Sequence, residues 1–231
     1  MDAEYIARLD RVSRVYYQGR VEVRAVDNLD LQIRPGEFSA LSGPSGSGKT
    51  TILNMIGALD KPTSGTVYLE GRDLTRLGRG ELSRLRRDRV GFVFQAYNLV
   101  PVLTAYENAE FVLALQNVPV QERRDRVMAV LEEVGMAEYV NRRPDELSGG
   151  QQQRIAIARA VVSDPAIVLA DEPTANVDLE AANTILDLME DLNARKGVTF
   201  LFSTHDRLVM DRARRLVKLR DGRLEDDNQA A

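Results

Sequence analysis

The stretch that decides the fold is Gly43-Pro44-Ser45-Gly46-Ser47-Gly48-Lys49-Thr50. It fits the phosphate-binding pattern G-x-x-x-x-G-K-[ST], in which glycines let successive backbone N–H groups turn toward one anion. Residues 37–42 before it predict a short strand, and residues 51–59 after it carry apolar side chains at helical spacing. A strand, a glycine-rich turn and a helix N-terminus together predict a P-loop (Walker A motif), because the helix dipole adds partial positive charge.

Two side chains of this loop have specific expected roles. Lys49 can reach the β- and γ-phosphates of a nucleotide, and the Thr50 hydroxyl can ligate Mg²⁺. The nucleotide-binding residues that we expect here are Gly43, Pro44, Ser45, Gly46, Ser47, Gly48, Lys49, Thr50 and Thr51. The alternative is a glycine- and serine-rich turn with no ligand, which the flanking strand and helix make less favourable.

The composition excludes several other classes of protein. With 31 basic and 35 acidic residues among 231, the net charge is −4, so no nucleic-acid partner is expected. The chain has no cysteine, which excludes a disulfide framework, a zinc–thiolate cluster and a catalytic thiol. No apolar run approaches the roughly 20 residues that span a bilayer, and the acidic N-terminus lacks a signal-peptide core. We expect a soluble chain that acts on membranes only through a partner.

The periodicity predicts an α/β chain with a helical insertion. Residues 5–12 and 21–34, linked by 16–19, alternate as an antiparallel β layer. The apolar runs 89–94, 166–170 and 198–203 are typical of buried parallel strands. Helical patterns cover 108–115, 121–134, 150–162 and 179–195, with a last strand near Val217 and Leu219. Residues 225–231 are acidic and polar and predict a frayed tail.

Two adjacent carboxylates end the strand 166–170. Ligands of parallel α/β sheets bind at the carboxyl edge, where Asp171 and Glu172 would lie. Asp171 would hold Mg²⁺, directly or through water, and Glu172 would orient and polarise the attacking water as general base. The alternative is a pair of exposed carboxylates that open a loop before Pro173, and the P-loop in the same chain argues against it.

Five motifs follow one another in a characteristic order. They are the P-loop, Gln95 at a strand end, Leu147-Ser148-Gly149-Gly150-Gln151, the apolar strand with Asp171-Glu172, and the lone histidine His205. This ordered set resembles the ABC-transporter ATPase family and extends over nearly the whole chain. The resemblance implies a P-loop NTPase (RecA-like) core with an N-terminal antiparallel β layer and a helical subdomain insertion. We expect one domain over 1–231, with 1–95 and 161–231 as β layer and core and about 96–160 as the helical subdomain.

The resemblance also implies roles for three residues that would contact the phosphates, the metal or the adenine ring of ATP. His205 would contact the γ-phosphate, and Gln95 would touch Mg²⁺ or the water and pass the nucleotide state to the helical subdomain. Tyr16 would stack on adenine. The alternatives are a structural histidine, a locally bonded glutamine, and a tyrosine that packs in the β layer while Tyr17 takes the adenine.

The signature residues Leu147, Ser148, Gly149, Gly150 and Gln151 have two interpretations that are compatible. Ser148 and Gln151 form the helix-capping pattern S-x-x-Q. In the family this surface faces the ATP held by a second subunit, so two copies would enclose two Mg-ATP. Asp178 resembles the D-loop aspartate that crosses this interface, and it is also suited to cap the following helix.

The subfamily follows from residues 91–101 and 103–108. Together with 171–176 they resemble the lipoprotein-releasing and macrolide-efflux ATPases, which work by mechanotransmission, although Val177 replaces the usual leucine. The resemblance implies an integral membrane permease as partner and a cytoplasmic, peripheral location on the inner membrane. We expect the partner to dock between the core and the helical insertion, at residues 99–103.

Three other functions remain open at this stage. They are the cell-division ABC ATPase, a soluble ABC-type ATPase that acts on nucleic acid or ribosomes, and a catalytically dead binding module. Lys49, Glu172 and His205 are all present, which argues against the last.

Overall fold

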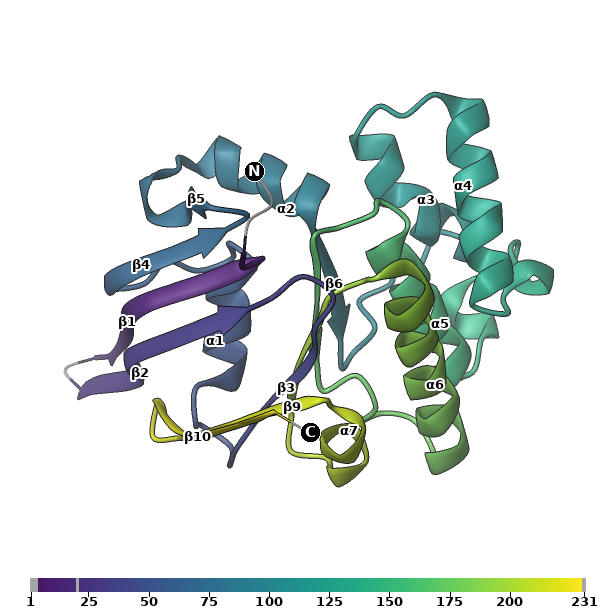
Figure 1. The fold of residues 1–231 in the computed structure, drawn as a ribbon. Helices are drawn as coiled ribbons and strands as arrows, with labels where there is room; N and C mark the ends of the chain where they lie inside the picture. Colours follow the sequence, from purple (N-terminus) through teal and green to yellow (C-terminus); the bar gives the residue numbers. More distant parts are fainter. Residues whose placement is uncertain (1–3, 20, 230–231) are drawn as a thin grey trace.

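The computed structural model describes residues 4–19 and 21–229 (Figure 1). The strands are β1 (Ala7–Gln18), β2 (Val21–Ile33), β3 (Phe38–Ser42), β4 (Ser64–Leu69), β5 (Arg72–Asp73), β6 (Val90–Phe94), β7 (Ile167–Asp171), β8 (Phe200–Thr204), β9 (Arg215–Arg220) and β10 (Arg223–Gln229). The helices are α1 (Lys49–Ile56), α2 (Arg79–Arg89), α3 (Ala105–Leu115), α4 (Val120–Glu133), α5 (Gly149–Val161), α6 (Leu179–Lys196) and α7 (Arg207–Arg212). Short 3₁₀ helices lie at Leu74–Arg76, Ala137–Tyr139 and Pro144–Glu146.

Two sheets form the frame of the molecule. The first is antiparallel, in the order β2-β1-β4-β5. The second has the order β10-β9-β3-β8-β7-β6, and all of its strands except β10 run parallel. Strands β3 and β8 are buried along their whole length, as expected for a parallel sheet covered on both faces. The α/β fold and the antiparallel β layer are therefore confirmed.

Helix α1 lies between the two sheets and fixes the P-loop there. It contacts β2 and β4 on one side and β7 and β8 on the other. Its residues Ile52, Met55 and Ile56 belong to the apolar core that includes both the β layer and the strands of the parallel sheet. Because the helix is held from both sides, the loop at its N-terminus has a rigid base.

A second apolar core covers the other face of the parallel sheet. It combines Phe38, Phe200 and Phe202 of the central strands with residues of α3, α4, α5 and α6. Helices α3, α4 and α5 contact one another and stand beside the core in Figure 1. Residues 95–104 between β6 and α3 form a loop, and α3 begins at Ala105, three residues before the predicted start at residue 108. The buried Asn108 side chain holds this loop by bonding the backbone of Val100, Leu103 and Thr104.

Two predictions were wrong: the link between the first two strands at residues 16–19 and the frayed tail at residues 225–231. Strand β1 continues to Gln18, so Tyr16 and Tyr17 belong to the strand and not to the link. Residues 225–229 are part of β10, which pairs with β9, and only residues 230–231 of the predicted tail lie outside the described part. The polar run forms a strand because its carboxylates meet cations of β9: Arg215 with Asp227, Lys218 with Asp226, and Arg220 with Glu225.

Among the described residues, no helix has the length and apolar character needed to cross a bilayer. Residues 1–3 of the acidic N-terminus lie outside the described part.

Candidate functional site

The P-loop backbone needs glycine at two positions. Gly43 and Gly48 have φ of 149° and 100°, a region that side chains disfavour. A Cβ atom on Gly43 would lie 2.2 Å from the carbonyl oxygen of Leu219, and one on Gly48 would lie 2.4 Å from that of Ala25. Lys49 Nζ donates to the carbonyl oxygens of Gly43 (2.7 Å) and Pro44 (3.0 Å). The ammonium group therefore lies over the loop, within reach of an anion bound to it.

A cavity of about 580 Å³ opens over this loop. It is lined by Val23, Arg24, Ala25, Pro44, Ser45, Gly46, Ser47, Gly48, Lys49, Thr50, Thr51, Gln95, Glu172, Ser203 and His205. The ends of β6, β7 and β8 meet here at the carboxyl edge of the parallel sheet, where ligands of such sheets bind. Most of the predicted site residues thus share one cavity, although they come from four separate parts of the sequence.

The residues predicted to hold a metal are adjacent. Thr50 Oγ1 donates to Asp171 Oδ1 at 3.2 Å, which brings together a helix N-terminus and the end of β7. Magnesium prefers oxygen ligands, and in nucleotide sites it uses one or two protein groups together with phosphate oxygens. Within the described residues there is no group of three or more His, Cys, Asp or Glu suited to an all-protein metal site. The hydroxyl and the carboxylate therefore fit a metal that arrives with a nucleotide.

Glu172 and His205 form a directly bonded pair. Glu172 Oε1 lies 2.5 Å from His205 Nδ1, and Glu172 Oε2 accepts from Thr204 Oγ1 at 3.0 Å. The Glu172 side chain is only 16% exposed, whereas that of His205 is 73% exposed. Glu172 also has φ of 48°, and such strain in a non-glycine residue is concentrated at functional sites. The sequence predicted both residues, but not their contact.

Gln95 lines the cavity and is exposed. Its backbone oxygen accepts from Asn176 Nδ2 at 2.9 Å. Asn176 was missed as a site residue, because a lone asparagine after Asp171-Glu172-Pro173 carries no signal of its own. The bond joins the end of β6 to the segment that follows β7.

Tyr16 does not line the cavity. It pairs in register with Val23, which does, but its hydroxyl donates to Asp60 Oδ2 at 2.7 Å and the Arg14 guanidinium lies 4.5 Å from its ring centre. Tyr17 is 71% exposed. Sequence reasoning also missed the β2 residues 23–25 of the cavity wall, because only the register of β2 against β1 reveals them.

The signature residues lie apart from the cavity. None of residues 147–151, all within the described part of the chain, is among those that line it. Ser148 caps α5: its Oγ accepts from the Gln151 N–H at 3.3 Å, and Gln151 Oε1 accepts from the Ser148 N–H at 2.8 Å. Asp178 caps α6 by accepting from the Ala181 N–H at 2.8 Å. Both capping predictions are confirmed.

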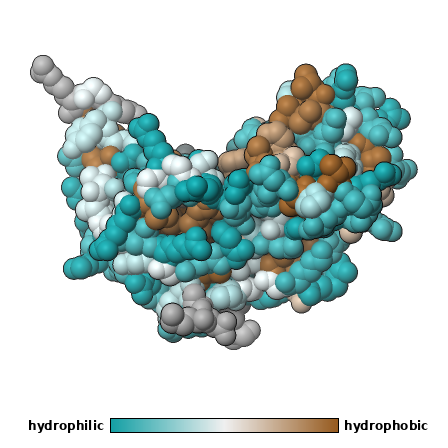
Figure 2. Space-filling view, turned by 90° about the horizontal axis from the view of Figure 1, so that it is seen from above, coloured by the Kyte–Doolittle hydropathy of each residue, from teal (hydrophilic) through white to brown (hydrophobic). Residues whose placement is uncertain are grey.

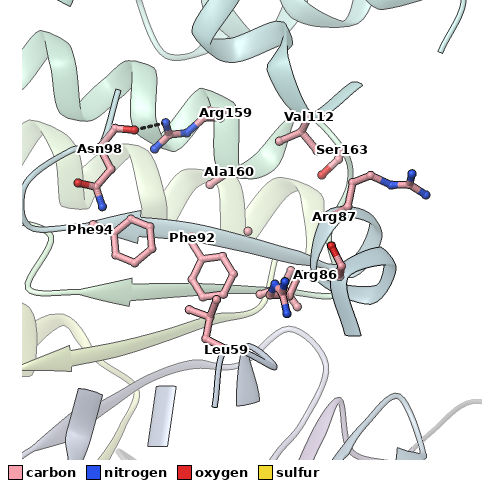
Figure 3. Close-up of a pocket in the computed structure, with 13 residues that line it drawn as sticks. Leu59, Arg86, Arg87, Phe92, Phe94, Asn98, Val112, Arg159, Ala160 and Ser163 are labelled. Carbon is pink, nitrogen blue, oxygen red and sulfur yellow. Dashed lines mark hydrogen bonds between the residues drawn. The ribbon is translucent and has the colours of Figure 1, made fainter. Parts of the chain in front are cut away.

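A second cavity of about 360 Å³ lies between α2, β6, α3 and α5 (Figure 3). We call it the groove. Its residues are Leu59, Ser83, Arg86, Arg87, Val90, Gly91, Phe92, Phe94, Asn98, Val112, Arg159, Ala160 and Ser163. Phe92 and Phe94 stack with ring centres 5.5 Å apart. Residues 99–103, the expected docking segment, do not line it in the described structure, and Leu99 packs on the apolar core instead.

The groove combines an apolar floor with positive charge. Three arginines, Arg86, Arg87 and Arg159, line it, and among the described residues that line it there is no Asp or Glu. Seen from above, the molecule has a hollow between the arm that carries the β layer and the arm that carries α3 and α4, with hydrophobic residues gathered on the latter (Figure 2).

Comparisons with known proteins show the family to which the chain belongs. The profile described as ABC transporter matches residues 26–175. An ABC transporter ATP-binding protein of Thermotoga maritima is 43% identical over 220 residues, 95% of this chain and 94% of that protein. The macrolide export ATP-binding/permease protein MacB of Hyphomonas neptunium is 43% identical over 223 residues, 96% of this chain but 34% of that protein. The chain thus spans about a third of the length of that relative.

Solved structures show the same fold. The dimeric structure of the ATP-binding cassette MJ0796, in a post-hydrolysis state bound to ADP and Pi, has a TM-score of 0.90 at 41% identity and covers 97% of this chain and 99% of that chain. That cassette comes from Methanocaldococcus jannaschii. The structure of cbiO1 from Clostridium perfringens, part of the transporter complex cbiONQ, has a TM-score of 0.88 at 26% identity, with 99% and 90% covered.

Proposed function

The chain belongs to the ABC transporter family, and from that membership we propose that it is the ATP-hydrolysing subunit of a transporter, which drives an integral membrane permease. The observation that carries the proposal is one cavity lined by Lys49, Thr50, Glu172 and His205, with Asp171 hydrogen-bonded to Thr50. It supplies a cation for phosphates, oxygen ligands for a metal and a base for water. The whole of 1–231 would be one ABC ATPase domain, with about 96–160 as its helical subdomain.

The chemistry is phosphoryl transfer to water. The P-loop N–H groups and Lys49 would hold the β- and γ-phosphates. Thr50 and Asp171 would hold Mg²⁺, with Gln95 at its edge, and bound Mg²⁺ neutralises charge on the phosphate oxygens. Glu172, held at both oxygens by His205 and Thr204, would orient the attacking water and take its proton.

A second copy of the chain would complete the site. The signature residues 147–151 lie outside the cavity of their own chain, so they would reach an ATP only across an interface. Two copies would then enclose two Mg-ATP, with Asp178 at the interface. Tyr16 would approach the adenine from β1, next to Val23 in the cavity wall.

The groove would receive the permease. Its stacked phenylalanines and the arginines Arg86 and Arg159 suit a short amphipathic helix with one apolar face and acidic side chains beside it. The third arginine, Arg87, is already paired with Asp88. Such a partner would place the chain on the cytoplasmic side of the membrane as a peripheral subunit. Its ATP hydrolysis would drive export or lipoprotein release by mechanotransmission, and the MacB relatives are macrolide export ATP-binding/permease proteins.

Release of phosphate from Mg-ATP by the purified chain tests the proposal. Lys49→Ala should reduce it to background, because no other cation of the loop replaces the ammonium. Lys61→Ala is the matched control, since Lys61 donates to the carbonyl oxygens of Thr75 and Leu77 away from the cavity. Wild-type activity in Lys49→Ala, or stimulation of hydrolysis by RNA or DNA, would count against the proposal.

A further inference from the structure

The Tyr97 hydroxyl lies where three segments of the chain meet. It donates to the backbone oxygen of Asn176 at 2.8 Å. A Cβ atom built on Gly149 would lie 2.7 Å from the same hydroxyl and 3.2 Å from the Asn176 oxygen. Tyr97 itself is two residues beyond Gln95. One hydroxyl thus bonds the loop after β6 to the segment after β7, and it lies next to the first residue of α5.

The backbone at this point is held in an unfavourable conformation. Tyr97 and Asn98 have φ of 57° and 50°, where non-glycine residues are uncommon. Arg159 of α5 holds both: its Nη2 donates to the Tyr97 oxygen at 2.8 Å. Its Nη1 donates to the Asn98 oxygen at 2.5 Å, and this bond is drawn in Figure 3. Two successive strained residues persist only where the surroundings fix them, and such places are concentrated at functional sites.

A further hydrogen bond joins α5 to the segment that follows β7. Gln153, buried in α5, donates from Nε2 to the Pro173 oxygen at 2.5 Å, so α5 also holds the segment that follows Glu172. Burial raises the pKa of Tyr97 above its ordinary value. Asn98 and Arg159 line the groove, whereas Tyr97 contacts the signature glycine and Asn176. Neighbouring residues therefore contact the groove and the signature segment.

We infer that Tyr97 is a positioning residue for ATP hydrolysis. Its hydroxyl fixes the start of α5, which carries the signature residues, relative to residues 172–178. The general base Glu172 and the signature residues therefore keep the same relative positions when two chains associate. Tyr97 differs from Gln95 because the Tyr97 side chain does not line the P-loop cavity, whereas Gln95 does. The role of Tyr97 rests on the proposed composite site of two chains.

The test is Tyr97→Phe, which keeps the ring and removes only the hydroxyl. We expect kcat for Mg-ATP to fall about threefold to tenfold, the range for loss of one hydrogen bond. The KM for ATP and the unfolding temperature should stay at their wild-type values, because the P-loop and the apolar cores are unchanged. Tyr106→Phe is the matched control, since its hydroxyl contacts only Glu110 within α3, at 3.4 Å.

Three outcomes would overturn the role: an unchanged kcat, an equal loss in Tyr106→Phe, or a loss accompanied by a raised KM or a lowered unfolding temperature. Ser148→Arg in the same assay separates this inference from the composite site. If Ser148→Arg abolishes hydrolysis while Tyr97→Phe does not change it, the composite site stands and the role of Tyr97 is wrong. If Ser148→Arg hydrolyses ATP at the wild-type rate, both are wrong.

Discussion

The ring nitrogen Nδ1 of His205 lies 2.5 Å from Oε1 of Glu172, and the other carboxylate oxygen of Glu172 is held by Thr204. Both oxygens of the expected base are therefore oriented by residues at the end of β8. Because each oxygen has its own hydrogen-bond partner, the carboxylate has little freedom to turn away from the cavity. This fixed orientation is what a base that positions one water molecule requires.

Glu172→Gln should bind ATP but hydrolyse it roughly 10²–10⁴-fold more slowly, because the amide cannot accept the proton of the water. The variant should therefore accumulate as a dimer in Mg-ATP. Size-exclusion chromatography with and without Mg-ATP, together with phosphate release, measures both effects. A hydrolysis rate near that of the wild type would remove Glu172 from its role.

Glu172 and His205 should behave as one unit in a double-mutant cycle. His205→Ala alone should slow hydrolysis, because the carboxylate loses the contact that orients it. Added to Glu172→Gln, the same change should slow it little further, since residues that act together are not additive. Full additivity of the two losses would mean that the histidine acts separately, for example on the phosphate alone.

A mixture of two inactive chains should recover activity. In a heterodimer of Lys49→Ala and Ser148→Arg, one site combines an intact P-loop with an intact signature, and the other carries both defects. Phosphate release by the mixture should exceed that of either homodimer. Purification through two different affinity tags would show whether heterodimers form. If they form and the mixture stays inactive, the two composite sites do not work independently of each other.

Val112→Glu should uncouple the chain from its permease. Val112 lines the groove, and a carboxylate there would oppose both the apolar contact and the acidic helix that we expect as partner. Basal ATP hydrolysis should stay near wild type, while co-purification with the permease from detergent-solubilised membranes should be lost. Val120→Glu is the control, because Val120 is 70% exposed at the start of α4 and does not line the groove. Normal permease binding by Val112→Glu would place the docking site elsewhere.

The β10 strand should stabilise the fold in a pH-dependent way. The hydrogen-bonded Arg215 guanidinium lowers the pKa of Asp227 below its ordinary value of 3.8. A carboxyl group whose pKa is lowered by folding stabilises the folded state above its unfolded pKa, and the effect is lost as the pH falls through the folded pKa. Asp227→Asn should therefore lower the unfolding temperature by about 1–3 °C at pH 7.

This difference from wild type should shrink below about pH 4, where unfolded aspartate takes up its proton. Asp221→Asn is the matched control, because Asp221 has φ of 48° in the turn before β10 and asparagine tolerates that region. An equal effect of both variants, or a constant difference down to pH 3, would show that the ion pair does not stabilise the strand.

The sequence by itself determined the local parts of this protein. The P-loop, the apolar strands on either side of the expected site and the caps at Ser148 and Asp178 were all predicted. Each depends on residues within one or two turns of each other, so the pattern of side chains along the chain is enough. The same holds for the ends of β6, β7 and β8, because apolar runs stop where polar residues begin.

The tertiary structure alone decided which of these parts meet. Glu172 and His205 are 33 residues apart, and Tyr97 and Asn176 are 79 apart. Their contacts depend on the order of strands in the sheet and on the packing of α5, which no single segment encodes. Strand β10 was missed for the same reason: its carboxylates look like a solvated tail until β9 supplies the cations and the backbone partners that make pairing more stable than solvation.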